Sequence, residues 1–167
     1  MLPVTESTLV VRTDFADPDA WDRVRKAVAY PPGGDLVSAA FTFVDDPRYA
    51  GLSPVSALEL VPRRPAHQMV ALADTVTMAT PDRPLLVVDL IDDPGQVFRS
   101  APEVLWHVAS SLFVAKGYFH EYVRSVGDDG VYRCGGLDGQ IKVLAAIASL
   151  KGVPFDADDY AGLSRRR

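Results

Sequence analysis

The stretch Leu9-Val10-Val11-Arg12-Thr13-Asp14-Phe15, followed by Asp17-Pro18, indicates the fold class of this chain. The apolar, β-branched run ends at an aspartate and predicts a first, central β-strand. Asp17 at an N-cap and Pro18 at the first helical position predict that a helix begins immediately afterwards. Its inward face is formed by apolar residues at helical spacing, namely Trp21, Val24 and Val28. The chain therefore opens with a strand followed by a helix.

Further strands and helices are expected along the rest of the chain. The strand candidates are Ala39–Asp45, Met69–Ala73, Leu85–Ile91, Val97–Arg99 and Val131–Arg133. The helix candidates begin at Ser53-Pro54 (with Val55, Leu58 and Val61 inward), at Pro102, at Phe119 and at Asp138, which is expected to be a cap. Asp92-Asp93-Pro94-Gly95 predicts a hairpin turn, and Pro31-Pro32-Gly33-Gly34 the end of the first helix. The sequence predicts an α+β fold, with a mixed sheet of about four to six strands and packed helices.

The length and composition limit the class of protein. The chain has 167 residues, of which 48% are hydrophobic, and it carries a formal net charge of −5. These values predict a single domain over 1–167 that does not bind nucleic acid nonspecifically. The longest apolar runs are far shorter than the ~20 residues that span a bilayer, and no signal peptide is evident. The sequence predicts a cytoplasmic protein without membrane contact.

Motifs for metals and common cofactors are not found. The three histidines lack zinc-ligand spacing, and the single Cys134 excludes an internal disulfide and any Cys-x-x-Cys motif. Neither of the common glycine-rich phosphate-binding motifs is present. Cys134, beside Arg133 and Gly135-Gly136, has the neighbours of a reactive thiolate, but a lone cysteine is more often a small apolar side chain. We therefore predict no metal and no cofactor.

Aspartates follow several of the expected strands. Asp14, Asp45, Asp46, Asp92 and Asp93 would gather at one sheet edge if their strands were parallel neighbours, and could then bind Mg²⁺ or act as a base. The alternative is that each caps a turn or helix. The predicted hairpin places Asp92 and Asp93 on an antiparallel turn, so a capping role is favoured for these two residues.

One helix carries an acid, an imidazole and a hydroxyl at a spacing of four. Glu103, His107 and Ser111 share a helix face, in the order of a catalytic triad. The apolar residues Leu105, Val108, Ala109 and Leu112 occupy the other side. Helical periodicity therefore predicts that the three polar residues face water.

Residues 106–122 are the most aromatic part of the chain. Aromatic side chains line apolar pockets and anchor partners, although core packing is the ordinary alternative. We predict a binding role for this segment and, with it, for two of the aspartates. The candidate binding residues are Trp106, His107, Phe113, Tyr118, His120, Tyr122, Asp14 and Asp45.

Four motifs carry a resemblance to a known family. They are Leu9–Phe15 with Trp21, Phe43–Pro47 with Tyr49–Gly51, Pro84–Leu90 through Phe98-Arg99, and Asp128–Arg133. Over residues 8–134 the chain resembles an uncharacterised family of small single-domain actinobacterial proteins, described only as a domain of unknown function. The resemblance implies a shared fold and a bacterial cytoplasmic protein, but no activity. The chain departs from the family pattern at Ser110–Tyr122, at Cys134, where a glycine is expected, and in a helical extension over 135–167.

Two functions follow as hypotheses. The first is a non-catalytic accessory or binding protein of a bacterial pathway, whose partner is a small apolar molecule or a protein. The alternative is a small cofactor-independent enzyme of secondary metabolism, of the cyclase or isomerase type. A deep pocket that combines aromatic walls with a buried imidazole or carboxylate favours the enzyme, and a flat apolar patch favours the binding module.

Overall fold

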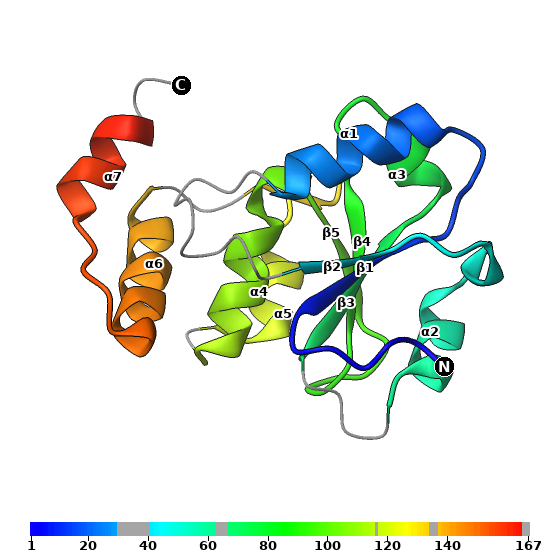
Figure 1. The fold of residues 1–167 in the computed structure, drawn as a ribbon, viewed down its shortest axis with the longest axis horizontal. Helices are drawn as coiled ribbons and strands as arrows, with labels where there is room; N and C mark the ends of the chain where they lie inside the picture. Colours follow the sequence, from blue (N-terminus) through cyan, green and yellow to red (C-terminus); the bar gives the residue numbers. More distant parts are fainter. Residues whose placement is uncertain (30–40, 63–66, 116, 134–136, 165–167) are drawn as a thin grey trace.

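A six-stranded mixed sheet lies at the centre of the computed structural model, which describes residues 1–29, 41–62, 67–115, 117–133 and 137–164 (Figure 1). Its strand order is β2-β1-β3-β4-β5-β6. The strands are β1 (Thr8–Arg12), β2 (Phe41–Val44), β3 (Met69–Ala73), β4 (Leu85–Asp89), β5 (Val97–Ser100) and β6 (Val131–Tyr132). β1 is parallel to β2 and β3, β4 is antiparallel to both its neighbours, and β6 is parallel to β5. The predicted α+β fold is confirmed, and β1 is an interior strand of the sheet, next to the edge strand β2.

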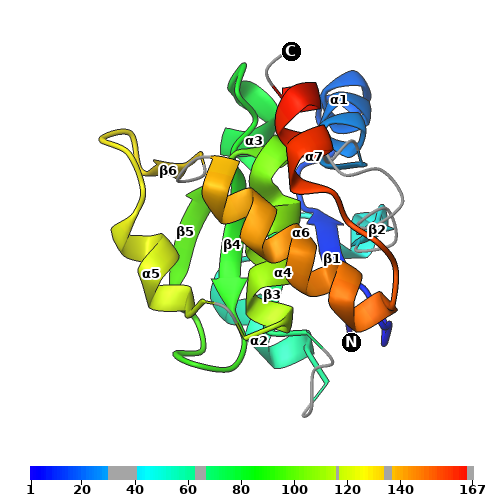
Figure 2. The same cartoon turned by 90° about the vertical axis from the view of Figure 1, so that its left-hand side faces the viewer.

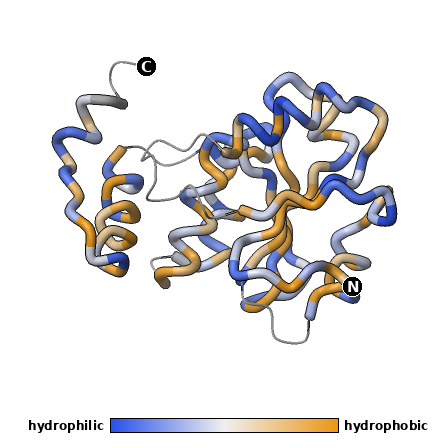
Figure 3. The backbone as a smooth tube through the Cα atoms, viewed as in Figure 1, coloured by the Kyte–Doolittle hydropathy of each residue, from blue (hydrophilic) through white to orange (hydrophobic). Residues whose placement is uncertain are grey.

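Side-chain alternation along the strands divides the core between the two faces of the sheet. Val10 of β1 points into a cluster with α1 (Pro18–Ala29), α4 (Leu105–Phe113) and α5 (Phe119–Arg124). Val11 points to the opposite face, where Ala57 of α2 (Pro54–Leu60) packs. Both valines are fully buried, and burial of such a side chain contributes about 1.5–3 kcal/mol. In Figure 3 the central strands are hydrophobic along their length, whereas α1 carries many hydrophilic residues.

A third cluster joins the C-terminal helices α6 (Leu137–Lys151) and α7 (Ala157–Ser164) to α4. Trp106 of α4 is 1% exposed and packs with Leu144 of α6 and Tyr160 of α7. Figures 1 and 2 show α6 beyond α4, on the side away from the sheet. α4 is therefore enclosed between the sheet and α6.

Short polar side chains define several helix and turn boundaries. Asp17 accepts a hydrogen bond from the Ala20 amide at 2.9 Å, and Ser53 accepts one from Ser56, as expected of N-caps. The predicted hairpin joins β4 to β5, and the buried Asp89 carboxylate accepts three backbone amides of its turn, those of Ile91, Asp92 and Asp93. The predicted caps and turn follow from local chemistry.

Several details differ from the sequence-based expectation. Val55 is 69% exposed rather than inward, because α2 buries Ala57 instead. Asp138 lies within the first turn of α6 and is not its cap, since the helix begins at Leu137. Two short helices were not expected, α3 (Thr75–Ala79) and α7, because neither carries a long apolar period. Pro31–Gly34, Cys134 and its two following glycines lie outside the described residues.

Candidate functional site

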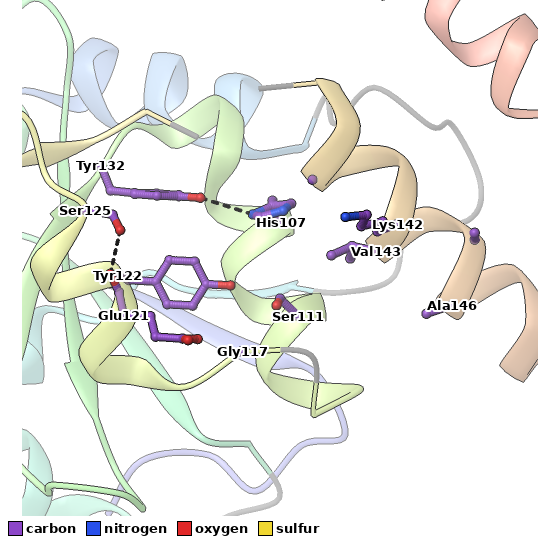
Figure 4. Close-up of a pocket in the computed structure, with 12 residues that line it drawn as sticks. His107, Ser111, Gly117, Glu121, Tyr122, Ser125, Tyr132, Lys142, Val143 and Ala146 are labelled. Atoms are coloured by element: carbon purple, nitrogen blue, oxygen red, sulfur yellow. Dashed lines mark hydrogen bonds between the residues drawn. The ribbon is translucent and has the colours of Figure 1, made fainter. Parts of the chain in front are cut away.

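A cavity of about 570 Å³ lies among α4, α5, β6 and α6 (Figure 4). Each of these elements contributes side chains or backbone to the wall. The lining residues are His107 and Ser111 of α4, Gly117, then Glu121, Tyr122 and Ser125, then Tyr132, and finally Gly139, Lys142, Val143, Ala145 and Ala146 of α6. The volume falls within the range of ~300–1,000 Å³ that is typical of small-molecule sites.

The polar face of α4 is buried, contrary to the prediction that it faces water. His107 is 7% exposed and Ser111 is 3% exposed, whereas Glu103 is exposed as expected. Helical periodicity identified the face toward the sheet correctly. It could not reveal α6, which lies about 30 residues further along the chain and covers the other face. The polar residues of α4 therefore line a cavity between two helices.

His107 is the buried titratable group of this cavity. Its Nδ1 lies 3.5 Å from the Tyr132 hydroxyl, and its Nε2 has no hydrogen-bond partner among the described residues. Burial lowers the pKa of His107 below its ordinary value of 6.5, and the nearby backbone of Gly139, which is too poorly aligned for a regular hydrogen bond, acts in the opposite direction with a smaller effect. The imidazole is therefore mainly neutral at pH 7 and keeps one nitrogen able to accept a proton.

Aromatic rings form the wall beside His107. Tyr122 and Tyr132 meet edge to face with their ring centroids 5.1 Å apart. Both pack against Phe98 of β5, Tyr122 in a stacked arrangement at 5.8 Å and Tyr132 edge-on at 6.2 Å. Such contacts with a core residue fix the ring positions. The cavity has a rigid aromatic wall anchored to the sheet.

Two glycines mark positions where backbone approaches the cavity side chains closely. A Cβ at Gly117 would lie 3.0 Å from the Ser111 hydroxyl oxygen and 3.2 Å from that of Tyr122, which is tighter than ordinary contact. A Cβ at Gly139 would lie 3.7 Å from Nε2 of His107. The absence of a side chain at Gly117 lets the chain pass next to the polar groups of the wall, whereas the contact at Gly139 is of ordinary length.

The structure brings two of the predicted aromatic and histidine residues into the cavity. His107 and Tyr122 line it, while Trp106 packs on the α6 and α7 side and is not part of the wall. Phe113 and Tyr118 are 67% and 63% exposed, and the exposed His120 stacks on Tyr118 at 5.7 Å. These three lie outside the cavity.

Ten of the twelve lining residues were not proposed as site residues from the sequence, among them Ser111, Tyr132 and Lys142. Ser111 had the correct spacing from His107 but was assigned to a solvated face. Tyr132 lies in a two-residue strand, and no sequence pattern relates it to α4. Lys142 is one of four lysines, on a helix that the resemblance places outside the family core. Their shared location depends on tertiary packing alone.

The aspartates after the strands do not form one group. Asp14 and Asp45 follow the parallel strands β1 and β2 and are linked by the buried Arg12, which donates to the Asp14 carbonyl at 3.0 Å and to the Asp45 carboxylate at 3.2 Å. Asp46 accepts from the Arg48 amide at the start of a short 3-10 helix, Pro47–Tyr49. Asp92 and Asp93 lie at the opposite edge of the sheet, because β4 runs antiparallel to β3.

An ion pair between Asp74, which follows β3, and Arg99 was not predicted from the sequence. Asp74 caps α3 through the Thr77 amide and receives two hydrogen bonds from Arg99 of β5, the shorter at 2.7 Å. Burial alone would raise the pKa of Asp74, but the hydrogen bonds from Arg99 and Thr77 outweigh it, so the pKa lies below 3.8. This carboxylate is ionised and fully engaged with the fold.

The described residues contain no group of three or more His, Cys, Asp or Glu side chains arranged to hold a metal ion. Over the same residues, no helix combines the length and the apolar composition needed to cross a bilayer.

Comparison with known proteins gives one family match. A model described as "Domain of unknown function (DUF6924)" matches residues 7–134. No match was found among curated proteins or among solved structures. Three walls of the cavity, from α4, α5 and β6, lie inside the matched part, and the fourth, from α6, follows it.

Proposed function

The chain belongs to the DUF6924 family, whose description assigns no activity, and we propose that it is a small-molecule-binding protein with its ligand in the cavity between α4 and α6. The observation that carries the proposal is His107 Nε2, a buried polar atom without a hydrogen-bond partner among the described residues, on the wall of a cavity of about 570 Å³. A buried polar atom without a partner costs about 1–3 kcal/mol, so a ligand group that binds it recovers stability.

The composition of the wall supports a compact, largely apolar ligand. Tyr122 and Tyr132 offer aromatic surface, and Val143 and Ala146 of α6 offer aliphatic surface opposite them. Several polar groups accompany these surfaces, but the surface that the wall exposes to the cavity is mainly apolar, which is typical of pockets that bind apolar molecules and orient them through a few hydrogen bonds. The same composition supports a small molecule over a protein partner, because the surface is hollow rather than flat.

One observation favours a second candidate, a cofactor-independent enzyme of the isomerase or cyclase type. The imidazole of His107 is neutral at pH 7, buried and close to the Tyr132 hydroxyl, which is the arrangement of a general base. In this function His107 accepts a proton from the ligand and returns it at another atom. The test is incorporation of solvent deuterium into a bound carbon acid, measured by NMR, which the enzyme proposal expects to stop in His107→Gln.

We also propose a cellular location and a biological source for the protein. The single cysteine and the acidic composition support a reduced, cytoplasmic location, and the resemblance supports an actinobacterial source. A role in secondary metabolism belongs to the enzyme candidate only.

A neutral fluorescent probe tests the binding function. N-phenyl-1-naphthylamine fluoresces strongly in apolar sites and is small enough for the cavity. We expect saturable binding to the full chain at one site, and loss of that binding in Ala146→Phe, which fills the cavity from α6. Ser149→Phe introduces the same side chain on the exposed side of the same helix and should bind the probe normally. Equal binding by both variants would place the probe elsewhere and contradict the proposal.

A further inference from the structure

Lys142 is a cation at the cavity without a counter-ion among the described residues. It lies on α6, lines the cavity, and extends toward His107 in Figure 4. The ion pairs of the described chain involve arginines only, and no described carboxylate lies within 4.0 Å of the Lys142 ammonium group. Lys142 is exposed, and because an ammonium group only donates hydrogen bonds, an anionic oxygen in the cavity can replace water as its acceptor.

His107 presents its unpartnered nitrogen on the same side. Gly139, whose backbone faces Nε2 of His107, precedes Lys142 by three residues, so the two positions share one face of α6. When the Tyr132 hydroxyl donates to Nδ1, the ring hydrogen is on Nε2, which is then a donor without a well-aligned acceptor among the described residues, although the Gly139 backbone lies near it. Two donors therefore converge on one part of the cavity.

The acidic groups near the cavity do not satisfy these donors. Glu121 lines the wall, where its Oε2 accepts the Tyr118 amide at 2.8 Å, and its carboxylate forms no ion pair with Lys142. Asp138 lies one turn before Lys142 on α6, and its side chain is exposed and outside the lining. The remaining wall near Lys142 is formed by the aliphatic side chains of Val143 and Ala146.

We propose that the ligand is a small apolar acid, with its anionic oxygens bound by Lys142 and Nε2 of His107 and its apolar body packed between Tyr122 and Val143. A carboxylate or sulfonate has acceptor lone pairs for both donors, and a charged hydrogen bond is about twice as strong as a neutral one. This inference rests on the proposed binding function and adds the chemical class of the ligand. It also makes α6, which follows the family-matched part, the source of the charge selectivity.

Two probes with the same ring system test the inference. 8-Anilinonaphthalene-1-sulfonate carries one sulfonate, and N-phenyl-1-naphthylamine is the same molecule without it. We expect the sulfonate to bind the full chain about tenfold more tightly than the neutral probe, as one charged hydrogen bond predicts. Lys142→Met should remove that preference, so that the ratio of the two affinities falls to about one. Lys142→Arg should retain the preference, and Lys151→Met, at the far end of α6, should have no effect.

The outcomes separate the two proposals. Equal affinity for both probes, or an unchanged preference in Lys142→Met, overturns the acidic ligand while the binding function stands. Failure of both probes to bind contradicts the binding function, and the inference with it. A preference that is lost equally in Lys142→Met and Lys151→Met reflects the general charge of α6 and overturns the specific role of Lys142.

Discussion

His107 combines the features on which the candidate site depends, and its burial makes the stability of the protein depend on pH. The pKa of His107 is lowered by burial, while in the unfolded chain it returns to about 6.5. Below pH 6.5 the unfolded chain therefore binds more protons than the folded one, and the unfolding free energy falls as the pH falls. The contribution of the neutral His107 side chain to the unfolding free energy is fully present above pH 6.5. It decreases by up to about 1.4 kcal/mol per pH unit below that value.

Denaturant unfolding between pH 8 and pH 5 measures this effect. We expect the unfolding free energy of His107→Gln to fall less steeply below pH 6.5 than that of the parent chain. His67 also has a pKa lowered by burial and keeps part of the slope in both proteins. His120→Gln, at an exposed position, is the control and should keep the full slope. The same slope in all three proteins would mean that His107 is accessible to water.

Asp74 is expected to matter for the fold rather than for binding. Its carboxylate caps α3 and pairs with Arg99, and both side chains are mostly buried, at 24% and 21% exposure. Asp74→Ala should lower the unfolding free energy by about 2 kcal/mol, through loss of both the cap and the pair. Asp74→Asn keeps a good cap and should lose only about 1 kcal/mol. Urea denaturation distinguishes these values, and an equal loss in both variants would show that the cap contributes nothing.

At the scale of elements, α6 is the helix on which the cavity depends, and two leucines on it provide a matched test. Leu144 is fully buried against α4, whereas Leu150 is 67% exposed. Leu144→Ala should cost about 2–4 kcal/mol and shift the fluorescence of the buried Trp106. Leu150→Ala should change the unfolding free energy by less than about 0.5 kcal/mol. Similar, small effects of both substitutions would indicate that α6 is not packed on α4.

The elements themselves could be predicted from the sequence to a large extent. The β1 run, the Asp17 and Ser53 caps and the hairpin at Asp92–Gly95 depend on neighbours within a few residues, and these were predicted correctly. The site could not be predicted in this way. His107 and Tyr132 are 25 residues apart and meet only through the pairing of β5 with β6 and the packing of α4. The burial of the polar face of α4 likewise depends on α6, which no local pattern relates to it.

At the scale of the whole molecule, the cavity lies between the sheet-bound layer and the outer helices. The sheet, α4 and α5 belong to the family-matched part. The helix α6, which follows that part in the sequence, forms the remaining wall of the cavity. The matched part provides the imidazole and the aromatic wall, and the following helix provides Lys142 and the aliphatic wall. In the proposed binding function, recognition of the ligand is therefore divided between two separate parts of one chain.

The central claim, that this cavity is a ligand site built around His107, is tested most directly by NMR of the imidazole nitrogens. The chain has three histidines, so each ring can be resolved and assigned by substitution. On titration with N-phenyl-1-naphthylamine, we predict that the His107 resonances shift saturably with the affinity found by fluorescence, while those of His67 and His120 remain unchanged. Unchanged His107 resonances at probe saturation, or a shift confined to His120, would contradict the account.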